Sequence, residues 1–225
     1  MSVQALIFDV DGTLAETEEV HRAAFNAAFV DAGLVWHWDV PIYGALLKVT
    51  GGKERLHHYA KLQGQELGTD MVQALHAAKN RHYGTMMQQG RAQLRPGVAE
   101  LIAQAKADGL RLAIATTTSL VNVEVLIGST LGKAGMTLFE AIVAGDDVAK
   151  KKPAPDAYLK ALETLHLPAS ACLAFEDSAN GLRSALGAGI ATIITPGLYT
   201  TGEDFGGATA LLLDLSGFQL ARYRA

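Results

Sequence analysis

Two carboxylates two residues apart, Asp9 and Asp11, follow a short apolar run near the start of the chain, and Gly12 comes directly after them. The apolar run is typical of a strand buried in a parallel sheet. In open α/β sheets ligands bind beyond the carboxyl ends of the strands, so the carboxylate pair is expected where chemistry occurs. We interpret it as a centre for phosphoryl transfer. The alternative is a polar turn after the strand.

Hydroxyl side chains end a second apolar run and form the segment Thr116, Thr117, Thr118 and Ser119. Such hydroxyls can donate hydrogen bonds to phosphoryl oxygens. Threonine also suits strands, so a purely structural role is the alternative for this segment. The chemical interpretation therefore depends on what the other strand ends carry.

A run of lysines, Lys150, Lys151 and Lys152, follows a third apolar run and precedes Pro153. Lysine runs are usually solvated, and this is the expectation for Lys150 and Lys151. Lys152 differs because Pro153 restricts it to an extended backbone next to the start of a helix. Its ammonium can therefore be aimed at a fixed point, as the binding of a phosphoryl group requires.

A fourth apolar run ends in the acidic pair Glu176 and Asp177. Asp177 and Asp9 offer hard oxygen ligands of the kind that bind Mg²⁺, with water and a substrate phosphate completing the octahedron. The competing role for Asp177, or for Ser178, is to cap the next helix. A carboxylate that attacks a dianionic phosphate needs Mg²⁺, an ammonium and hydroxyl donors to offset charge repulsion. The four strand ends supply this set in order.

Composition limits the classes of function. With 225 residues, 49% hydrophobic and 19% charged, the chain is expected to be globular with a substantial core. No apolar run approaches the roughly 20 residues of a membrane span, and no secretory signal is recognisable, so we expect a cytoplasmic protein. A net charge of −4 argues against a nucleic-acid partner. The single cysteine, Cys172, is expected to be a small core residue.

The pattern of apolar runs predicts an α/β fold with a doubly wound parallel sheet. From residue 98 onward, helical and strand-like spacing alternate, whereas residues 17–32 and 65–87 have helical spacing and no parallel strand is recognisable between residues 15 and 92. We interpret the long interval as an inserted α-helical domain. The predicted domains are residues 1–14 and 95–225 for the α/β catalytic core and residues 15–94 for a helical cap.

The inserted domain contains a candidate anion-binding segment in residues 50–55, which we expect to form a loop. Gly51 and Gly52 permit close approach of the backbone to a ligand, and Lys53 and Arg55 could clamp a second phosphate. The alternative is a solvated loop. The aromatic residues around Trp36 and Trp38 are expected to form part of the domain's core.

The ordered set of carboxylates, hydroxyls, lysine and acidic pair resembles the haloacid dehalogenase superfamily of phosphotransferases over essentially the whole chain. The resemblance implies a Rossmann-like core with a helical cap after the first strand. It also implies that Asp9 is the nucleophile that becomes aspartyl-phosphate and that Asp11 is the general acid and base. For Mg²⁺, the resemblance implies that the ligands are Asp9, the Asp11 main-chain carbonyl and Asp177, with Glu176 nearby. For the phosphoryl group, it implies binding by Thr116 and Lys152.

The sequence is also similar to the CbbY subfamily of sugar phosphatases, in residues 15–22, 51–55, 115–119, 151–156 and 176–183. The resemblance implies that Glu18 contacts sugar hydroxyls, and the alternative is an i, i+4 pair with Arg22 on a solvated helix face. The other candidate substrate contacts that it implies are Glu16, His21, Gly51, Gly52, Lys53, Glu54, Arg55, Thr116, Thr117, Thr118 and Ser119, with Lys79 as a weaker candidate.

Together these features predict a Mg²⁺-dependent phosphatase for a small sugar bisphosphate. The CbbY resemblance implies xylulose 1,5-bisphosphate, an inhibitor of Rubisco, and hence a role in the Calvin cycle. Alternatives are a β-phosphoglucomutase-like mutase and a broader sugar-phosphate phosphatase. A non-catalytic binding protein is disfavoured because Asp9, Asp11 and Lys152 are all present. We expect a monomer whose partner is a small sugar phosphate, without a nucleic-acid or membrane partner.

Overall fold

The computed structural model describes residues 3–223 and divides the chain into two compact units. One unit, the α/β unit, contains Met1–Glu16 and Gln93–Ala225. The other, the helical unit, contains Thr17–Ala92. The chain therefore leaves the α/β unit soon after its first strand and returns to it when the helical unit is complete.

The α/β unit is built on a parallel sheet of six strands in the order β3-β2-β1-β4-β5-β6. The first strand lies inside the sheet, and later strands are added on both sides of it. This order confirms the predicted α/β fold with a doubly wound sheet. The strands are β1 (Ala5–Phe8), β2 (Arg111–Ala115), β3 (Ala141–Val143), β4 (Cys172–Glu176), β5 (Ala191–Ile194) and β6 (Ala210–Leu211).

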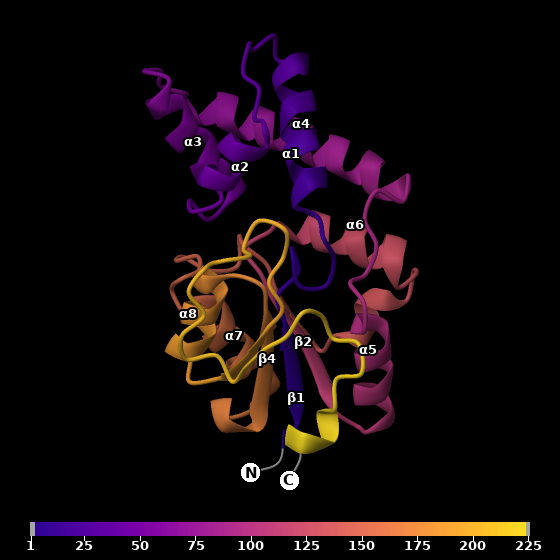
Figure 1. Ribbon diagram of the computed structural model, residues 1–225. Coiled ribbons are helices and arrows are strands. Elements are labelled where there is room, and N and C mark those ends of the chain that lie inside the picture. Colours follow the sequence, from indigo (N-terminus) through magenta and orange to yellow (C-terminus); the bar gives the residue numbers. More distant parts are fainter. Residues whose placement is uncertain (1–2, 224–225) are drawn as a thin grey trace. The chain divides into compact units, whose positions relative to one another are not determined.

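Helices cover both faces of this sheet, with α5 and α6 on one face and α7 and α8 on the other (Figure 1). Ile7, Ala113 and Ala174 of three central strands pack on one face in a cluster with Tyr158 and Leu165 of α7. The central strands are buried on both faces, as is typical of parallel sheets. The helices span Val98–Ala107 (α5), Leu120–Thr130 (α6), Asp156–Leu165 (α7) and Ala179–Gly187 (α8), with short 3-10 helices at Gly135–Leu138, Ala169–Ala171 and Leu220–Tyr223.

The strand register places the predicted chemical groups at one edge of the sheet. Phe8, the last residue of β1, pairs with Ile114 of β2 and with Phe175 of β4. Because the strands are parallel, the residues that follow these three positions emerge at the same edge. Asp9 and Glu176 follow at once, and the hydroxyl segment begins just after β2.

The helical unit contains α1 (Glu18–Asp31), α2 (Val40–Leu46), α3 (Gly52–Leu62) and α4 (Thr69–Gln88), and no strand lies within residues 17–92, all of which are described. Its core is aromatic: the Trp38 ring centroid lies 4.7 Å from that of Phe25, 4.9 Å from that of Phe29 and 5.4 Å from that of Tyr59. Trp36 is also buried, which confirms the predicted core role of this segment. Among the described residues, no helix is both long and apolar enough to cross a membrane.

The expectation of a loop over residues 50–55 is wrong, because α3 already begins at Gly52. Leu56, Tyr59 and Ala60 are buried at i, i+3 and i+4 spacing, so a buried helix face draws this segment into the helix. Gly51 comes directly before the helix, and its φ of 100° suits glycine. Lys53 and Arg55 are therefore helical residues close to an amino-terminal end.

Candidate active site

Lys152 joins two carboxylates at the carboxyl end of the sheet. Its ammonium nitrogen lies 2.5 Å from Asp9 Oδ1, just after β1, and 2.5 Å from Glu176 Oε1, at the end of β4. All three side chains are buried. Buried charges require partners of opposite sign, and this arrangement provides them. The structure thus brings together three predicted site residues from three distant segments, whereas Lys150 is exposed and Lys151 is half-buried.

Tyr158 completes this group and is not among the residues predicted from the sequence. Its hydroxyl donates to Glu176 Oε1 over 2.6 Å, and its ring centroid lies 5.1 Å from the Lys152 ammonium. On α7 its spacing with Ala161 and Leu165 indicates only a core position. The sequence therefore signals the burial of Tyr158, while no pattern around Tyr158 indicates that its hydroxyl donates to Glu176.

The charges of this group shift one another's pKa values. Burial raises the pKa of Asp9 from 3.8 to about 8, although the Lys152 ammonium opposes the shift. Burial alone would lower the pKa of Lys152, but the charges of Asp9 and Glu176 outweigh it and hold that pKa above its ordinary value. Burial, followed by the Glu176 charge, raises the pKa of Tyr158 well above 10.0. Lys152 is therefore a permanent cation, while Asp9 retains a proton readily unless further positive charge is near.

Asp9, Glu176 and Asp177 form a cluster of buried carboxylates in which one oxygen of each lies within 4.8 Å of the others. Two of them, Asp9 and Glu176, contact the Lys152 ammonium, so the three carboxylates and this one cation together carry more negative than positive charge. Glu176 Oε2 is buried and has no hydrogen-bond partner within residues 3–223. Hard oxygen ligands, excess negative charge and an open acceptor fit a divalent metal ion.

Asp177 does not cap α8, because Ser178 takes that role and accepts a hydrogen bond from the Gly181 main-chain nitrogen over 3.1 Å. The Asp177 carboxylate instead accepts from the Thr200 hydroxyl over 3.3 Å. It also lies against Gly12, where a Cβ atom would collide with it. Asp177 is therefore held between the loop after β1 and the segment after β5.

Asp11 and the hydroxyl segment follow the neighbouring strands β1 and β2. Asp11 is half-buried, and its charge contributes to the raised pKa of Asp9. Thr116 is buried, and its hydroxyl oxygen accepts from the Thr118 main-chain nitrogen over 3.2 Å. The remaining hydroxyl residues are half-buried, namely Thr117, Thr118 and Ser119. A local turn thus orders this segment beside the central strand.

Within the helical unit, Glu18 and Arg55 are connected through Tyr43, which is not among the residues predicted from the sequence. The Tyr43 hydroxyl donates to Glu18 Oε2 over 2.7 Å and accepts from the Arg55 guanidinium over 3.3 Å. Arg55 also donates to the Leu46 carbonyl and lies 5.2 Å from the Tyr43 ring centroid. Two residues that the resemblance assigns to substrate binding therefore belong to one hydrogen-bonded group.

Two alternatives considered for this unit are wrong. Arg55 does not lie in a solvated loop, since it is only 9% exposed and is held on the buried side of α3. Arg22 does not pair with Glu18. Its guanidinium instead binds Glu19, one turn before it, over 2.7 Å and the Trp38 carbonyl over 3.1 Å.

The other candidates in the helical unit differ in burial. His21 is buried and stacks on Tyr83, with 4.3 Å between ring centroids. Lys79 is also buried, and its ammonium lies 5.3 Å from the Phe25 ring centroid and 5.1 Å from that of Tyr83. Exposure increases at the start of α3, from buried Gly51 through half-buried Gly52 and Lys53 to exposed Glu54.

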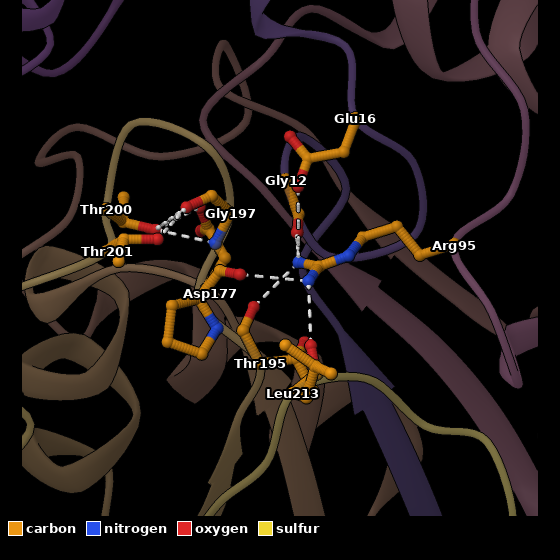
Figure 2. A network of polar contacts seen from close by, with 10 residues as sticks. Gly12, Glu16, Arg95, Asp177, Thr195, Gly197, Thr200, Thr201 and Leu213 are labelled. Carbon is orange, nitrogen blue, oxygen red and sulfur yellow. Dashed lines mark hydrogen bonds and ion pairs between the residues drawn. The ribbon is translucent and has the colours of Figure 1, made fainter.

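Glu16 is the last residue of the α/β unit before the helical unit. Its carboxylate lies 3.6 Å from the guanidinium of Arg95, and both belong to the network in Figure 2. Arg95 is not among the residues predicted from the sequence, because its partners are main-chain carbonyls from distant segments.

The chain is similar to known proteins in both sequence and structure. The haloacid dehalogenase-like hydrolase family matches residues 3–189. The chain is 54% identical to protein CbbY of Rhodobacter capsulatus over 96% of this chain and 95% of that protein. It is 51% identical to a CbbY protein of Cupriavidus necator over 93% of this chain and 85% of that protein. A crystal structure of a CbbY variant from Rhodobacter sphaeroides in complex with xylulose 1,5-bisphosphate is similar at a TM-score of 0.95 and 46% identity, covering 99% and 100% of the two chains.

Proposed function

The chain belongs to the haloacid dehalogenase-like hydrolase family, and from this premise we propose that it is a Mg²⁺-dependent phosphatase of xylulose 1,5-bisphosphate. The buried group of Asp9, Lys152 and Glu176 supports the reaction class, because it combines a carboxylate nucleophile with a fixed cation. The likeness to a CbbY protein that binds xylulose 1,5-bisphosphate supports the substrate. In this role the enzyme acts as a cytoplasmic monomer and removes an inhibitor of Rubisco from the Calvin cycle.

The proposed reaction has two steps at Asp9. In the first, the Asp9 carboxylate attacks phosphorus, the bond from phosphorus to the sugar oxygen breaks, and Asp11 donates a proton to that oxygen. In the second, Asp11 takes a proton from a water molecule that attacks the aspartyl-phosphate and releases inorganic phosphate. Lys152 and Thr116 bind the oxygens of the transferred group, whose negative charge they offset.

The metal would be held by Asp9, Asp177 and the main-chain carbonyl of Asp11, with Glu176 nearby. When bound, Mg²⁺ supplies positive charge that lets an anionic carboxylate approach an anionic phosphate. The excess of buried carboxylates and the open acceptor on Glu176 support this assignment. Lys152 and Tyr158 fix one Glu176 oxygen, Oε1, so the orientation of that carboxylate is set by the protein.

Recognition of the second phosphate is proposed for the helical unit. Arg55 is a buried cation whose partners are a carbonyl, a hydroxyl and an aromatic ring, and no carboxylate within residues 3–223 pairs with it. A permanent buried positive charge with neutral neighbours suits a phosphate ligand. Glu18 is proposed to accept hydrogen bonds from sugar hydroxyls. The other proposed contacts to substrate are Glu16, His21, Gly51, Gly52, Lys53, Glu54, Lys79, Thr117, Thr118 and Ser119.

The test is Mg²⁺-dependent phosphate release across a panel of sugar mono- and bisphosphates that includes xylulose 1,5-bisphosphate and ribulose 1,5-bisphosphate. Asp9→Asn serves as the blank. We expect xylulose 1,5-bisphosphate to have the highest kcat/KM, with ribulose 1,5-bisphosphate and the monophosphates far below it.

Two results would contradict the proposal in different ways. Equal phosphate release from all substrates would agree with the proposed phosphatase reaction but contradict the proposed preference for xylulose 1,5-bisphosphate. Conversion of β-glucose 1-phosphate to glucose 6-phosphate without net phosphate release would identify a mutase.

A further inference from the structure

Arg95 is a buried arginine whose guanidinium binds main-chain carbonyls in preference to side chains. Its donors reach the carbonyl oxygens of Gly12, Thr195 (2.7 Å), Pro196 (2.9 Å) and Leu213 (3.3 Å), as Figure 2 shows for most of them. The side chain is only 9% exposed. Four carbonyl acceptors on one guanidinium indicate that Arg95 fixes backbone positions.

The bound carbonyls come from three separate segments of the α/β unit. Gly12 follows β1, Thr195 and Pro196 follow β5, and Leu213 follows β6. Arg95 itself lies in the segment by which the chain re-enters this unit, where its main-chain nitrogen donates to Leu14 over 2.8 Å. A single side chain thus ties together the re-entry segment and the ends of three strands.

Two of these segments are the ones that hold Asp177. On one side, the Asp177 carboxylate lies against Gly12, where it leaves no room for a Cβ atom. On the other side, Thr200 donates to Asp177 over 3.3 Å and accepts from the Gly197 nitrogen over 2.8 Å. Arg95 holds the carbonyl of Gly12 and the carbonyls just before Gly197. It therefore connects both supports of the Asp177 carboxylate without touching it.

The chemistry of this link requires a guanidinium. Its planar fork carries five donors at fixed angles and remains charged at any pH of interest, so it can bridge carbonyls that lie in different directions. Lysine offers three donors from one atom and cannot span the same positions. A neutral side chain would leave the carbonyls of the buried residues Gly12 and Thr195 without this donor, which is costly.

We propose that Arg95 is a positioning residue for the metal site: it holds the loop after β1 and the segment after β5 at the separation that aims Asp177 at the metal. This inference rests on the proposed function, in which Asp177 is a metal ligand. Residues that orient metal ligands typically change metal affinity or activity by roughly 10- to 100-fold when they are replaced. Arg95 is expected to act in this range.

The test measures Mg²⁺ binding to purified protein by isothermal titration calorimetry, so it does not depend on turnover. Arg95→Lys and Arg95→Met are compared with Arg111→Met. Arg111 also binds through its guanidinium, to Glu140 over 2.5 and 2.6 Å, but it lies at the opposite, amino-terminal end of β2. We expect both Arg95 variants to raise the Mg²⁺ dissociation constant by roughly 10- to 100-fold and Arg111→Met to leave it unchanged.

Two further variants keep the inference testable if the Arg95 variants do not fold. Thr200→Val removes the hydroxyl that connects the segment after β5 to Asp177, whereas Thr200→Ser keeps it. Val is expected to weaken Mg²⁺ binding and Ser to retain it. In activity assays, the Mg²⁺ concentration for half-maximal kcat should rise in Arg95→Lys.

The outcomes separate this inference from the proposed function. Failure of the wild-type protein to bind Mg²⁺ would overturn the metal assignment itself. Wild-type binding with unchanged affinity in both the Arg95→Lys and Thr200→Val variants would overturn the role of Arg95 alone. A rise in KM for the substrate without a change in Mg²⁺ affinity would also overturn it, because the effect would then lie in substrate binding.

Discussion

The two units of the chain bury charge in opposite ways. In the α/β unit, three buried carboxylates lie close together and only one ammonium, that of Lys152, contacts two of them, so negative charge is in excess in this group. In the helical unit, the guanidinium of Arg55 is buried against neutral groups, a carbonyl and the hydroxyl and ring of Tyr43. The buried charge is therefore negative in one unit and positive in the other.

This difference suggests a division of labour. Unbalanced buried charge is costly to a fold, and it is often retained at functional sites where a ligand completes the balance. We infer that the α/β unit carries the reaction and its metal, while the helical unit contributes selectivity for a second phosphate. The following predictions test this division, beginning with the largest effect.

Asp9→Asn is expected to lower kcat by about 10⁴-fold or more, since it removes the nucleophile and leaves the rest of the site in place. The measurement is steady-state phosphate release at saturating Mg²⁺, with circular dichroism to establish that the variant is folded. Appreciable turnover by this variant would contradict the assignment of Asp9 as nucleophile and of the α/β unit as the reaction centre.

Lys152→Met is expected to lower the free energy of unfolding by about 3–5 kcal/mol, because Asp9 and Glu176 would remain buried without a cation. Arg55→Met should cost less, about 1–2 kcal/mol, since the groups left behind are neutral. Urea denaturation of both variants measures the difference. If both variants lost the same free energy of unfolding, the groups left behind in the two units would not differ in charge in the way that we infer.

Much of the α/β site could be predicted from the sequence. Asp9, Glu176 and the hydroxyl segment each follow an apolar run, and a parallel sheet necessarily gathers such positions at one edge. Lys152 could be singled out from its neighbours because a proline follows it. The contacts of Tyr158 and Arg95 could not be predicted, since their partners lie on segments far away in the sequence.

Less of the helical unit could be predicted from the sequence. Helix spacing identified α1 and α4, but α2 and α3 are short, and paired glycines at the start of α3 favour a loop interpretation. The spacing of Glu18 and Arg22 allows a local pair, whereas the structure joins Glu18 to Tyr43 from another helix. Side-chain pairing between helices depends on packing, which a single sequence pattern does not encode.

In metal-free protein, we expect the free energy of unfolding of Asp9→Asn to exceed that of the wild type by an amount that grows with pH. We call this difference the advantage of the variant. Because the folded-state pKa of Asp9 is raised to about 8, folded protein keeps a proton that the unfolded chain releases above about pH 4. Wild-type stability therefore falls as the pH rises toward 8, and the variant avoids this loss. We expect its advantage to increase by about 1 kcal/mol or more between pH 5 and pH 8.

The measurement is urea denaturation of both proteins in EDTA at several pH values. An advantage that stays constant over this range would contradict the idea that Asp9 is buried with excess negative charge.

Tyr43→Phe should have the smallest effect. It removes the hydroxyl between Glu18 and Arg55 and keeps the ring under the guanidinium, so the loss of stability should be about 1 kcal/mol. We expect KM for the bisphosphate to rise severalfold with little change in kcat, as both partners lose orientation. A fall in kcat with unchanged KM would indicate that this group takes part in the reaction instead.

The most direct test of the division of labour compares two substrates in one variant. The ratio of kcat/KM for xylulose 1,5-bisphosphate to that for the monophosphate that keeps only the reacting phosphate is measured in wild type, in Arg55→Ala and in the control Arg22→Ala. The account predicts that this ratio falls by about 10- to 100-fold in Arg55→Ala alone, because a charged contact to the second phosphate is lost. Equal losses on both substrates would contradict the assignment of selectivity to the helical unit.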